Sequence, residues 1–275
     1  MMRRLTPEEM VGLIRSETPF EAVASDYSFR LKVAAYAPYI CAAVHDGNQF
    51  RKSLWDNCTH SAYERWYEED PCTRELIASH PIVISGSDSR FEYDLNRPPE
   101  DCIFEDAWGK PLWKTKLPEV ERGLSLSKHN AFYRVAHALT AQIESKYGAA
   151  LVFDMHSYNW KRWEREVPTW NLGTTNIDNS RFGVLAESWR SRLAQIQLPN
   201  GIPSTARIND VFFGKGYFLK SLTDTFENTL VLATEISKVY CDETTGIIFP
   251  EVVDSAARQL KELIPLQLTE FQEYL

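Results

Sequence analysis

The chain has 275 residues, 44% hydrophobic and 25% charged, so its composition is that of a globular protein and excludes a mainly disordered one. The formal net charge of −8 argues against nucleic acid and anionic membrane surfaces as the main partners. The longest uncharged apolar stretch, residues 33–44, is far shorter than the ~20 residues of a membrane-spanning helix. No apolar signal core follows the N-terminal arginines, and we expect a cytoplasmic protein.

Helix signals recur along the chain. Thr6-Pro7-Glu8-Glu9 has the pattern of a capping box with proline in the first turn, which predicts a helix over about residues 5–16. Longer helical patterns cover 128–147, 180–197 and 252–275, and we expect the last to be interrupted at Pro265.

Short apolar runs predict buried strands over residues 39–44, 81–85, 149–153 and 229–234, and an alternating pattern predicts another over 90–96. Strands that alternate with helices indicate an α/β fold with a central mixed, mostly parallel sheet flanked by helices. No linker or repeat divides the chain, so we expect one domain over residues 1–275.

Three of these runs end in side chains that can do chemistry, namely His45, His156 and Glu235. Binding sites in such sheets lie at the carboxyl ends of the strands, so we expect the three side chains to gather there.

The two histidines are candidate metal ligands. Asp154 precedes His156 by two residues and therefore shares its face of the strand, where it can accept the second ring N–H and orient the ring. The alternative for His45 is that it only caps a strand through a hydrogen bond.

A run of three acids, Glu68-Glu69-Asp70, precedes a predicted helix over residues 73–79. Acids at this place commonly favour the helix dipole without any further role. One of them can instead supply the third ligand, because two histidines and one carboxylate form the hydrolytic zinc arrangement. The spacing alone does not choose between Glu69 and Asp70.

Glu235 is the candidate general base. A carboxylate at the end of a buried strand is expected to have a raised pKa, which suits a group that takes a proton from water and passes it to a leaving amine. The alternative is a glutamate paired with a buried lysine or arginine.

The segment SRFEYDLNRPP, residues 89–99, offers cations for an acidic substrate. Arg90, Asp94 and Asn96 share a face of the predicted strand and Arg97 follows, while Arg207 adds a further cation. The alternative is an internal ion pair from Arg90 or Arg97 to Asp94. The tryptophan-rich residues 160–170 receive no chemical role.

Taken in order, these segments resemble the N-formylglutamate amidohydrolase family. The resemblance covers about residues 38–245 and is carried by the following segments: DSRFEYDLNRPPE, WGKPLW, HNAFYRVAHALTAQIESKYG with ALVFDMHS, PTWNLGTTN, ARINDVFFGKGY and ATEISKVYCDE. Three places depart from the family pattern: Val44 and Asp46 around His45, the EEDP segment, and Ala206-Arg207-Ile208.

The resemblance implies a zinc-carboxypeptidase-like, phosphorylase/hydrolase-like fold and zinc-dependent hydrolysis of an amide on an acidic amino acid. It implies these roles: His45 and His156 as metal ligands with Asp70, or Glu69 one place away, as the acidic one; Glu235 as the base; Arg90, Asn96 and Arg97 as the oxyanion and substrate-carboxylate cluster.

We therefore expect one zinc per chain, with Arg90 stabilising the oxyanion, Arg207 assisting substrate binding, and Asp94 and Asp154 supporting the site from outside the ligands. The expected partner is a small N-acyl amino acid such as N-formylglutamate. A carboxypeptidase-like or other N-acyl amino acid hydrolase remains an alternative, as does a non-catalytic binding protein that keeps the cleft.

Overall fold

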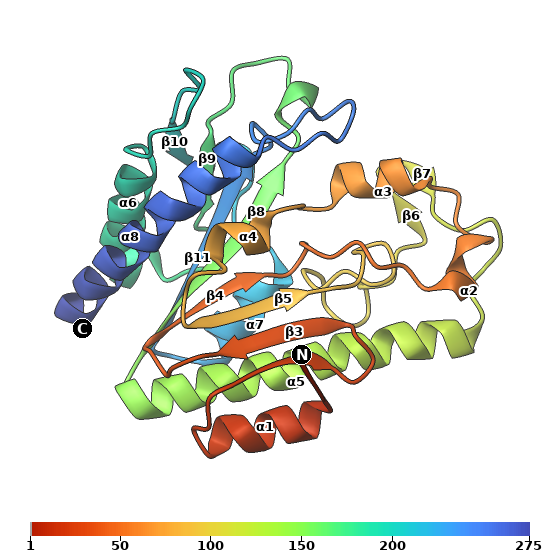
Figure 1. The fold of residues 1–275 in the computed structure, drawn as a ribbon, viewed down its shortest axis with the longest axis horizontal. Coiled ribbons are helices and arrows are strands. Elements are labelled where there is room, and N and C mark those ends of the chain that lie inside the picture. The colour runs from red at the N-terminus through yellow and green to blue at the C-terminus, as the bar shows by residue number, and fades with distance from the viewer. Residues whose placement is uncertain (1) are drawn as a thin grey trace.

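The computed structural model describes residues 2–275. Within them, nine strands form a mixed sheet in the order β1-β2-β3-β5-β4-β8-β11-β9-β10 (Figure 1). The strands are β1 (Arg3–Leu5), β2 (Phe20–Ala24), β3 (Phe29–Val33), β4 (Tyr39–Ala43), β5 (Ile82–Gly86), β8 (Ala150–Tyr158), β9 (Trp170–Gly173), β10 (Ala206–Ile208) and β11 (Thr229–Ser237). A separate pair consists of β6 (Asp106–Ala107) and β7 (Lys110–Pro111).

The centre of the sheet is parallel. Strand β4 pairs in parallel with β5 and β8, and β8 pairs in parallel with β11. The antiparallel pairs lie to either side, where β3 joins β2 to β5 and β9 joins β11. The predicted α/β fold with a mixed, mostly parallel sheet is therefore confirmed.

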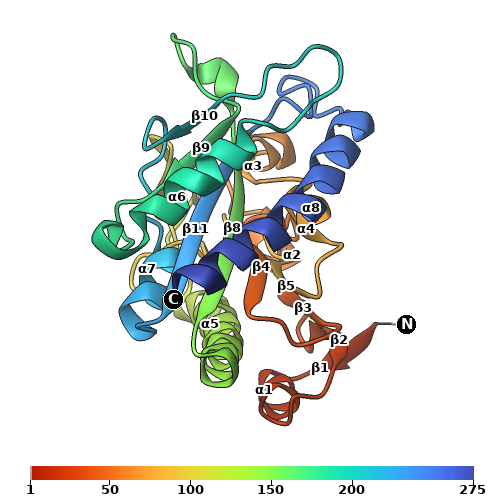
Figure 2. The ribbon, with the colours of Figure 1, turned by 90° about the vertical axis from the view of Figure 1, so that its left-hand side faces the viewer.

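Helices cover both faces of this sheet. They are α1 (Pro7–Arg15), α2 (Lys52–Trp55), α3 (Ala62–Glu68), α4 (Thr73–Ile77), α5 (Glu119–Tyr147), the 3-10 helix η1 (Trp160–Arg162), α6 (Asn179–Leu193), α7 (Tyr217–Thr225) and α8 (Pro250–Tyr274). Helix α8 packs against α4 and α6, and Figure 2 shows α6 and α8 crossing the strands on the side nearer the viewer. Helix α5 packs against α1, and its Phe132 meets Phe218 of α7 with ring centres 6.0 Å apart.

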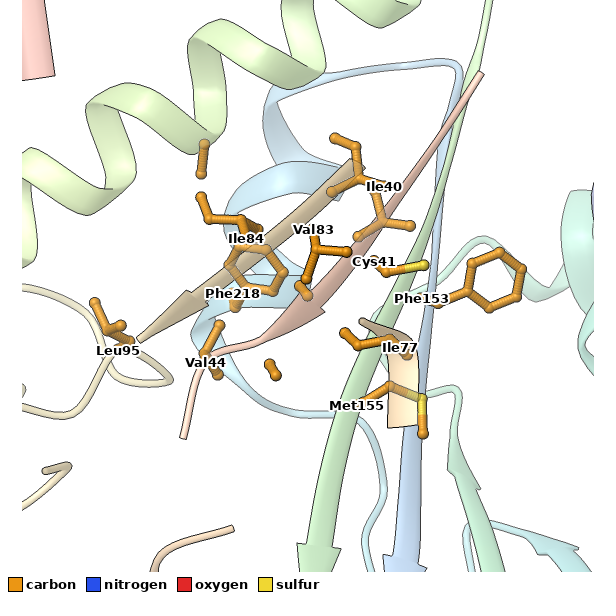
Figure 3. Packing of buried hydrophobic residues seen from close by; sticks show 14 of the residues in the cluster. Ile40, Cys41, Val44, Ile77, Val83, Ile84, Leu95, Phe153, Met155 and Phe218 are labelled. Carbon is orange, nitrogen blue, oxygen red and sulfur yellow. The ribbon is translucent and has the colours of Figure 1, made fainter. Parts of the chain in front are cut away.

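The core lies between the sheet and these helices. Figure 3 shows Cys41 of β4 beside Val83 of β5 and Phe153 of β8, which are its register partners, with Ile77 of α4 nearby. Phe153 also meets the ring of Trp189 in α6 edge-on at 4.9 Å. All five side chains are buried, and burying a side chain of this size contributes about 1.5–3 kcal/mol.

The predicted start of the first helix is confirmed, while two other helix ends differ from the prediction. The Thr6 side chain accepts a hydrogen bond from the Glu9 backbone N–H, and the Glu9 carboxylate accepts one from the Thr6 backbone, so the predicted capping box is present. Helix α5 begins nine residues before the predicted start, and α6 ends at Leu193 instead of residue 197.

The predicted interruption at Pro265 is wrong. Helix α8 continues through this proline, which lies on its exposed side. The buried stripe of Leu260, Ile264 and Phe271 runs past it. We attribute the continuity to this packing, which outweighs the single backbone hydrogen bond that proline removes.

The predicted strand over residues 90–96 is also wrong, because this segment forms consecutive turns. Its backbone N–H groups bond locally or to a distant loop: Glu92 N–H donates to the Ser89 carbonyl and Asp94 N–H to that of Cys102. Glu92 and Asp94 are as deeply buried as Phe91. The alternation therefore does not separate a buried face from an exposed one.

Strands β8 and β11 extend two residues beyond His156 and Glu235, so both side chains lie within strands and not at their ends. The apolar run marked only the first part of each strand. No helix in residues 2–275 is long and apolar enough to cross a membrane.

Candidate metal centre and active site

Two histidines and an aspartate from distant parts of the chain meet at the centre of the sheet. One atom each from His45, Asp70 and His156 lies within 4.8 Å of the others, and all three residues are buried. The Asp70 Oδ2 atom is 3.4 Å from His45 Nδ1 and 3.2 Å from His156 Nδ1. This group, called the His–Asp–His cluster below, combines two of the predicted ligands with one of the two candidate acids.

The sheet and its loops place the three side chains. His45 follows β4 directly, and His156 lies in β8, the parallel neighbour of β4. Asp70 lies between α3 and α4, where its backbone N–H donates to the His45 carbonyl at 3.0 Å. Close backbone packing follows at Gly47, since a Cβ atom there would lie 2.2 Å from the Ser87 carbonyl carbon.

An outer carboxylate orients each imidazole. His45 Nε2 is 2.7 Å from Asp94 Oδ1, and His156 Nε2 is 2.9 Å from Asp154 Oδ2. Both aspartates are at most 1% exposed. This is the arrangement in which a metal-binding histidine donates its other N–H to a carboxylate, which fixes the tautomer.

The residues present therefore fit a metal ion. When each Nε2–H donates outward, both neutral rings direct an Nδ1 lone pair at Asp70 Oδ2, so three acceptor atoms converge on one point. His45 Nδ1 is buried and has no hydrogen-bond partner among the described residues. Two histidine nitrogens and one carboxylate oxygen are a donor set that catalytic zinc sites use.

When no metal ion is bound, a proton on a histidine supplies the positive charge that these three converging acceptor atoms favour. Burial alone would lower the pKa of His156, but the carboxylates of Asp154 and Asp70 outweigh it and raise the pKa well above its ordinary value. Burial would raise the pKa of Asp70, but the hydrogen bond from His156 and the charges of His45 and His156 hold it well below its usual range. The centre thus favours a positive charge between the histidines and Asp70.

Glu69 lies outside the cluster. Its carboxylate accepts a hydrogen bond from the Ser89 hydroxyl, and burial raises the pKa of Glu69 to about 7. The residue ends α3 with extended backbone angles, φ −77° and ψ 167°. Successive side chains point to opposite sides of an extended chain, so Asp70 faces the histidines and Glu69 turns away.

Glu235 lies on β11, the strand next to the one that carries His156. It is the register partner of His156, and both line a cavity of about 260 Å³ that also contains Asn96 and Asp154. Burial raises the pKa of Glu235 to about 8, and the charge of His156 partly offsets this effect. The residue that we predicted as a base therefore lies beside the predicted ligand.

Arg90 forms the ion pair that the sequence offered as an alternative. Its Nε and Nη2 donate to Asp94 Oδ2 at 3.2 and 2.7 Å. The Asp94 carboxylate therefore joins Arg90 to His45. The Asn96 side chain lines the cavity beside Glu235, and its Oδ1 accepts from the Phe218 backbone at 3.1 Å.

Two predicted substrate-binding cations do not line this cavity. Arg97 is exposed, and its guanidinium packs over the Phe104 ring at 4.5 Å. Arg207 is 45% exposed and forms an ion pair with Asp210 at 3.0 Å.

Sequence reasoning missed three polar residues around the centre. Lys215 lines the cavity and has no ion-pair partner within residues 2–275; its only signal was its place between Gly214 and Gly216. Ser157, next to His156, donates to Asp70 Oδ1 at 3.2 Å. Lys238 is 1% exposed and donates to the Tyr67 carbonyl at 2.5 Å, close to Asp70, and nothing in the sequence marked it.

The sheet and the buried cluster define the class of protein: an α/β protein with a candidate hydrolytic site near the carboxyl ends of its parallel strands. Residues 37–240, most of the chain, match the family described as N-formylglutamate amidohydrolase. The chain therefore belongs to the N-formylglutamate amidohydrolase family.

Solved structures share the fold. The crystal structure of N-formylglutamate amidohydrolase from Ralstonia eutropha JMP134 has a TM-score of 0.69 and 16% identity, and the match covers 88% of this chain and 99% of that one. A gene product from Agrobacterium tumefaciens has a TM-score of 0.65 and 18% identity, with 89% and 96% covered. No curated protein matches the sequence significantly.

Proposed function

We propose that the protein is a zinc-dependent amidohydrolase that cleaves the amide of an N-acyl acidic amino acid, such as N-formylglutamate. The observation that carries the proposal is the His–Asp–His cluster, in which each histidine is backed by a buried carboxylate and Glu235 lies beside His156 in the same cavity. Membership of an amidohydrolase family supports the same chemistry.

His45, His156 and Asp70 would hold the metal, and Asp94 and Asp154 would keep the two imidazoles in place. When bound, zinc supplies a Lewis acid that polarises the amide carbonyl and lowers the pKa of a water molecule. We assign no ligand role to Glu69, since the Ser89 hydroxyl holds its carboxylate.

Glu235 is the proposed general base. Its carboxylate takes a proton from the attacking water and later delivers it to the departing amine. A pKa near neutrality suits both steps; burial raises the pKa of Glu235 to about 8, and a cation nearby would lower it. Arg90, fixed by Asp94, is the proposed cation that stabilises the developing oxyanion.

The substrate carboxylate needs a cation or an amide donor. Asn96 lies in the cavity and is the first candidate. Lys215, which lacks an acidic partner among the described residues, is the second. We propose that Arg97 and Arg207 act at the surface, where the substrate approaches; Arg207 shares the Asp210 carboxylate with Arg165.

The test combines metal content and turnover. We expect about one zinc per chain in protein purified without chelator, loss of the zinc in a His45→Ala, His156→Ala double variant, and hydrolysis of N-formyl-L-glutamate by the zinc-loaded wild type only. A wild type that binds no zinc when zinc is offered would contradict the proposal.

A further inference from the structure

The tryptophan-rich segment that the sequence left without a role forms part of a second cavity. This tryptophan cavity, of about 610 Å³, is lined among others by Trp160, Trp163, Thr169 and Ser237. Its volume is more than twice the 260 Å³ of the cavity beside Glu235, called the catalytic cavity below. It lies in the size range of small-molecule sites, which are lined mainly by apolar and aromatic side chains.

The two cavities follow one another along the same face of the sheet. Ala233 and Glu235 of β11 line the catalytic cavity, and Ser237 of the same strand lines the tryptophan cavity. Alternate residues of a strand share a face, and two residues span roughly 6.6 Å. The antiparallel neighbour β9 shows the same order. Gly173 lines the catalytic cavity, and Thr169, four residues earlier in the chain, lines the tryptophan cavity.

The side chain of Arg165 links the linings of the two cavities. Arg165, which lines the tryptophan cavity, donates to the Asp210 carboxylate at 2.6 Å and to the Asp210 carbonyl at 3.0 Å. The next residues, Val211 and Phe212, line the catalytic cavity. A group in the tryptophan cavity would therefore contact Arg165, whose partner Asp210 directly precedes residues that line the catalytic cavity.

The lining indicates the kind of group that fits. Val167, Ile202 and Val239 add apolar surface to the two indole rings. The Trp163 Nε1–H is buried without an acceptor among the described residues, although buried indole N–H groups usually have one. An aromatic or aliphatic group that carries one hydrogen-bond acceptor matches both features.

The direction of a bound substrate follows from the polar residues. Lys215 and Asn96 lie in the catalytic cavity and would take the carboxylate of an amino acid. The His–Asp–His cluster and Glu235 would take the amide. The acyl side of that amide then points along β11 towards Ser237 and the tryptophan cavity.

We propose that the tryptophan cavity binds the acyl group of the substrate, so that the enzyme accepts N-acyl amino acids whose acyl group is apolar or aromatic and much larger than formyl. The proposal rests on the proposed function, because it uses the same site of amide cleavage and changes only the acyl group.

The first experiment compares N-formyl-, N-butyryl-, N-octanoyl- and N-phenylacetyl-L-glutamate with the zinc-loaded enzyme. We expect kcat/KM to rise by about fourfold for each methylene that enters the cavity, since each buried CH₂ is worth ~0.8 kcal/mol. A value that falls steadily from formyl to octanoyl would overturn the proposal and leave the proposed function standing.

Variants assign the effect to the cavity. Trp163→Ala removes an aromatic wall and Val167→Trp fills part of the space, so each should lower the octanoyl-to-formyl ratio of kcat/KM by roughly tenfold. The matched control is Trp55→Ala, at an exposed tryptophan of α2 that lines neither cavity. Its ratio should equal that of the wild type. Unchanged ratios in both cavity variants, each with a wild-type melting temperature, would overturn the proposal.

A binding measurement separates this proposal from the proposed function. Calorimetry with the Glu235→Gln variant should detect N-octanoyl-L-glutamate binding that Trp163→Ala weakens by a similar factor. If the wild type cleaves no N-acyl amino acid but this binding is found, the cavity assignment is supported and the proposed hydrolysis fails. If no binding is found, the cavity assignment is refuted.

Discussion

Replacement of Asp154 by Asn tests whether the outer carboxylates hold the metal centre. In the structure Asp154 is 1% exposed, its Oδ2 lies 2.9 Å from His156 Nε2, and its Oδ1 is buried with no hydrogen-bond partner among the described residues. Asparagine keeps one acceptor oxygen, removes the negative charge, and places a buried NH₂ group where no acceptor is available. The imidazole therefore loses its charged partner and a donor is left unsatisfied.

Loss of such a partner commonly weakens metal binding by about 10- to 100-fold, which corresponds to ~1.4–2.7 kcal/mol. We expect the loss of zinc affinity in Asp154→Asn to lie near the upper end of this range, because the unsatisfied NH₂ group adds its own free-energy cost. Asp94→Asn should cost more, since Asp94 bonds to both His45 and Arg90 and its loss also removes the charged partner of the half-buried Arg90.

Competition against a fluorescent zinc chelator at fixed pH measures the dissociation constants. The matched control is Asp106→Asn, at an exposed aspartate of β6, which should leave zinc affinity unchanged. Thermal melts of the metal-free proteins exclude global unfolding as the cause. If Asp154→Asn binds zinc as tightly as the wild type, the outer carboxylate does not orient His156 and the reasoning is refuted.

Three further predictions concern single side chains. Glu235→Gln should lower kcat by about 10²- to 10⁴-fold at unchanged zinc content, and retained turnover would remove Glu235 from the mechanism. Asp70→Asn should lose zinc while Glu69→Gln keeps it, as elemental analysis can show; the opposite result would make Glu69 the ligand. Burial raises the pKa of Asp88 to about 6, from an ordinary value near 3.9. Between these values the folded state holds a proton that the unfolded chain has lost, so the free energy of unfolding should fall by up to about 3 kcal/mol as pH rises from 4 to 6. Urea unfolding should show a flatter profile for Asp88→Asn, and an identical slope would contradict this account.

The position of the candidate site could be predicted from the sequence because three side chains that can bind a metal or transfer a proton follow apolar runs. These runs form β4, β8 and β11, which are neighbours in the sheet. His45, His156 and Glu235 therefore lie close together. The choice of acid could not be predicted. Glu69 and Asp70 are adjacent, and the extended backbone at the end of α3 decides which one faces the histidines.

The segment 90–96 shows a different limit. Its alternation is real, but a strand needs a partner for its backbone groups, and here these groups bond to turns and to a distant loop. The turns bring Asp94 to His45, a contact across 49 residues that alternation does not encode.

The cations around the site show why substrate recognition is harder to predict than the His–Asp–His cluster. A sequence shows which residues carry a positive charge but not which charges are already neutralised. Arg90 is paired with Asp94, and Arg207 shares Asp210 with Arg165, whereas Lys215 has no acidic partner among the described residues and lines the catalytic cavity. An anion gains most from a cation without a competing carboxylate, because displacing an existing partner offsets the attraction. The carboxylate of the substrate is therefore expected to depend more on Lys215 than on Arg207.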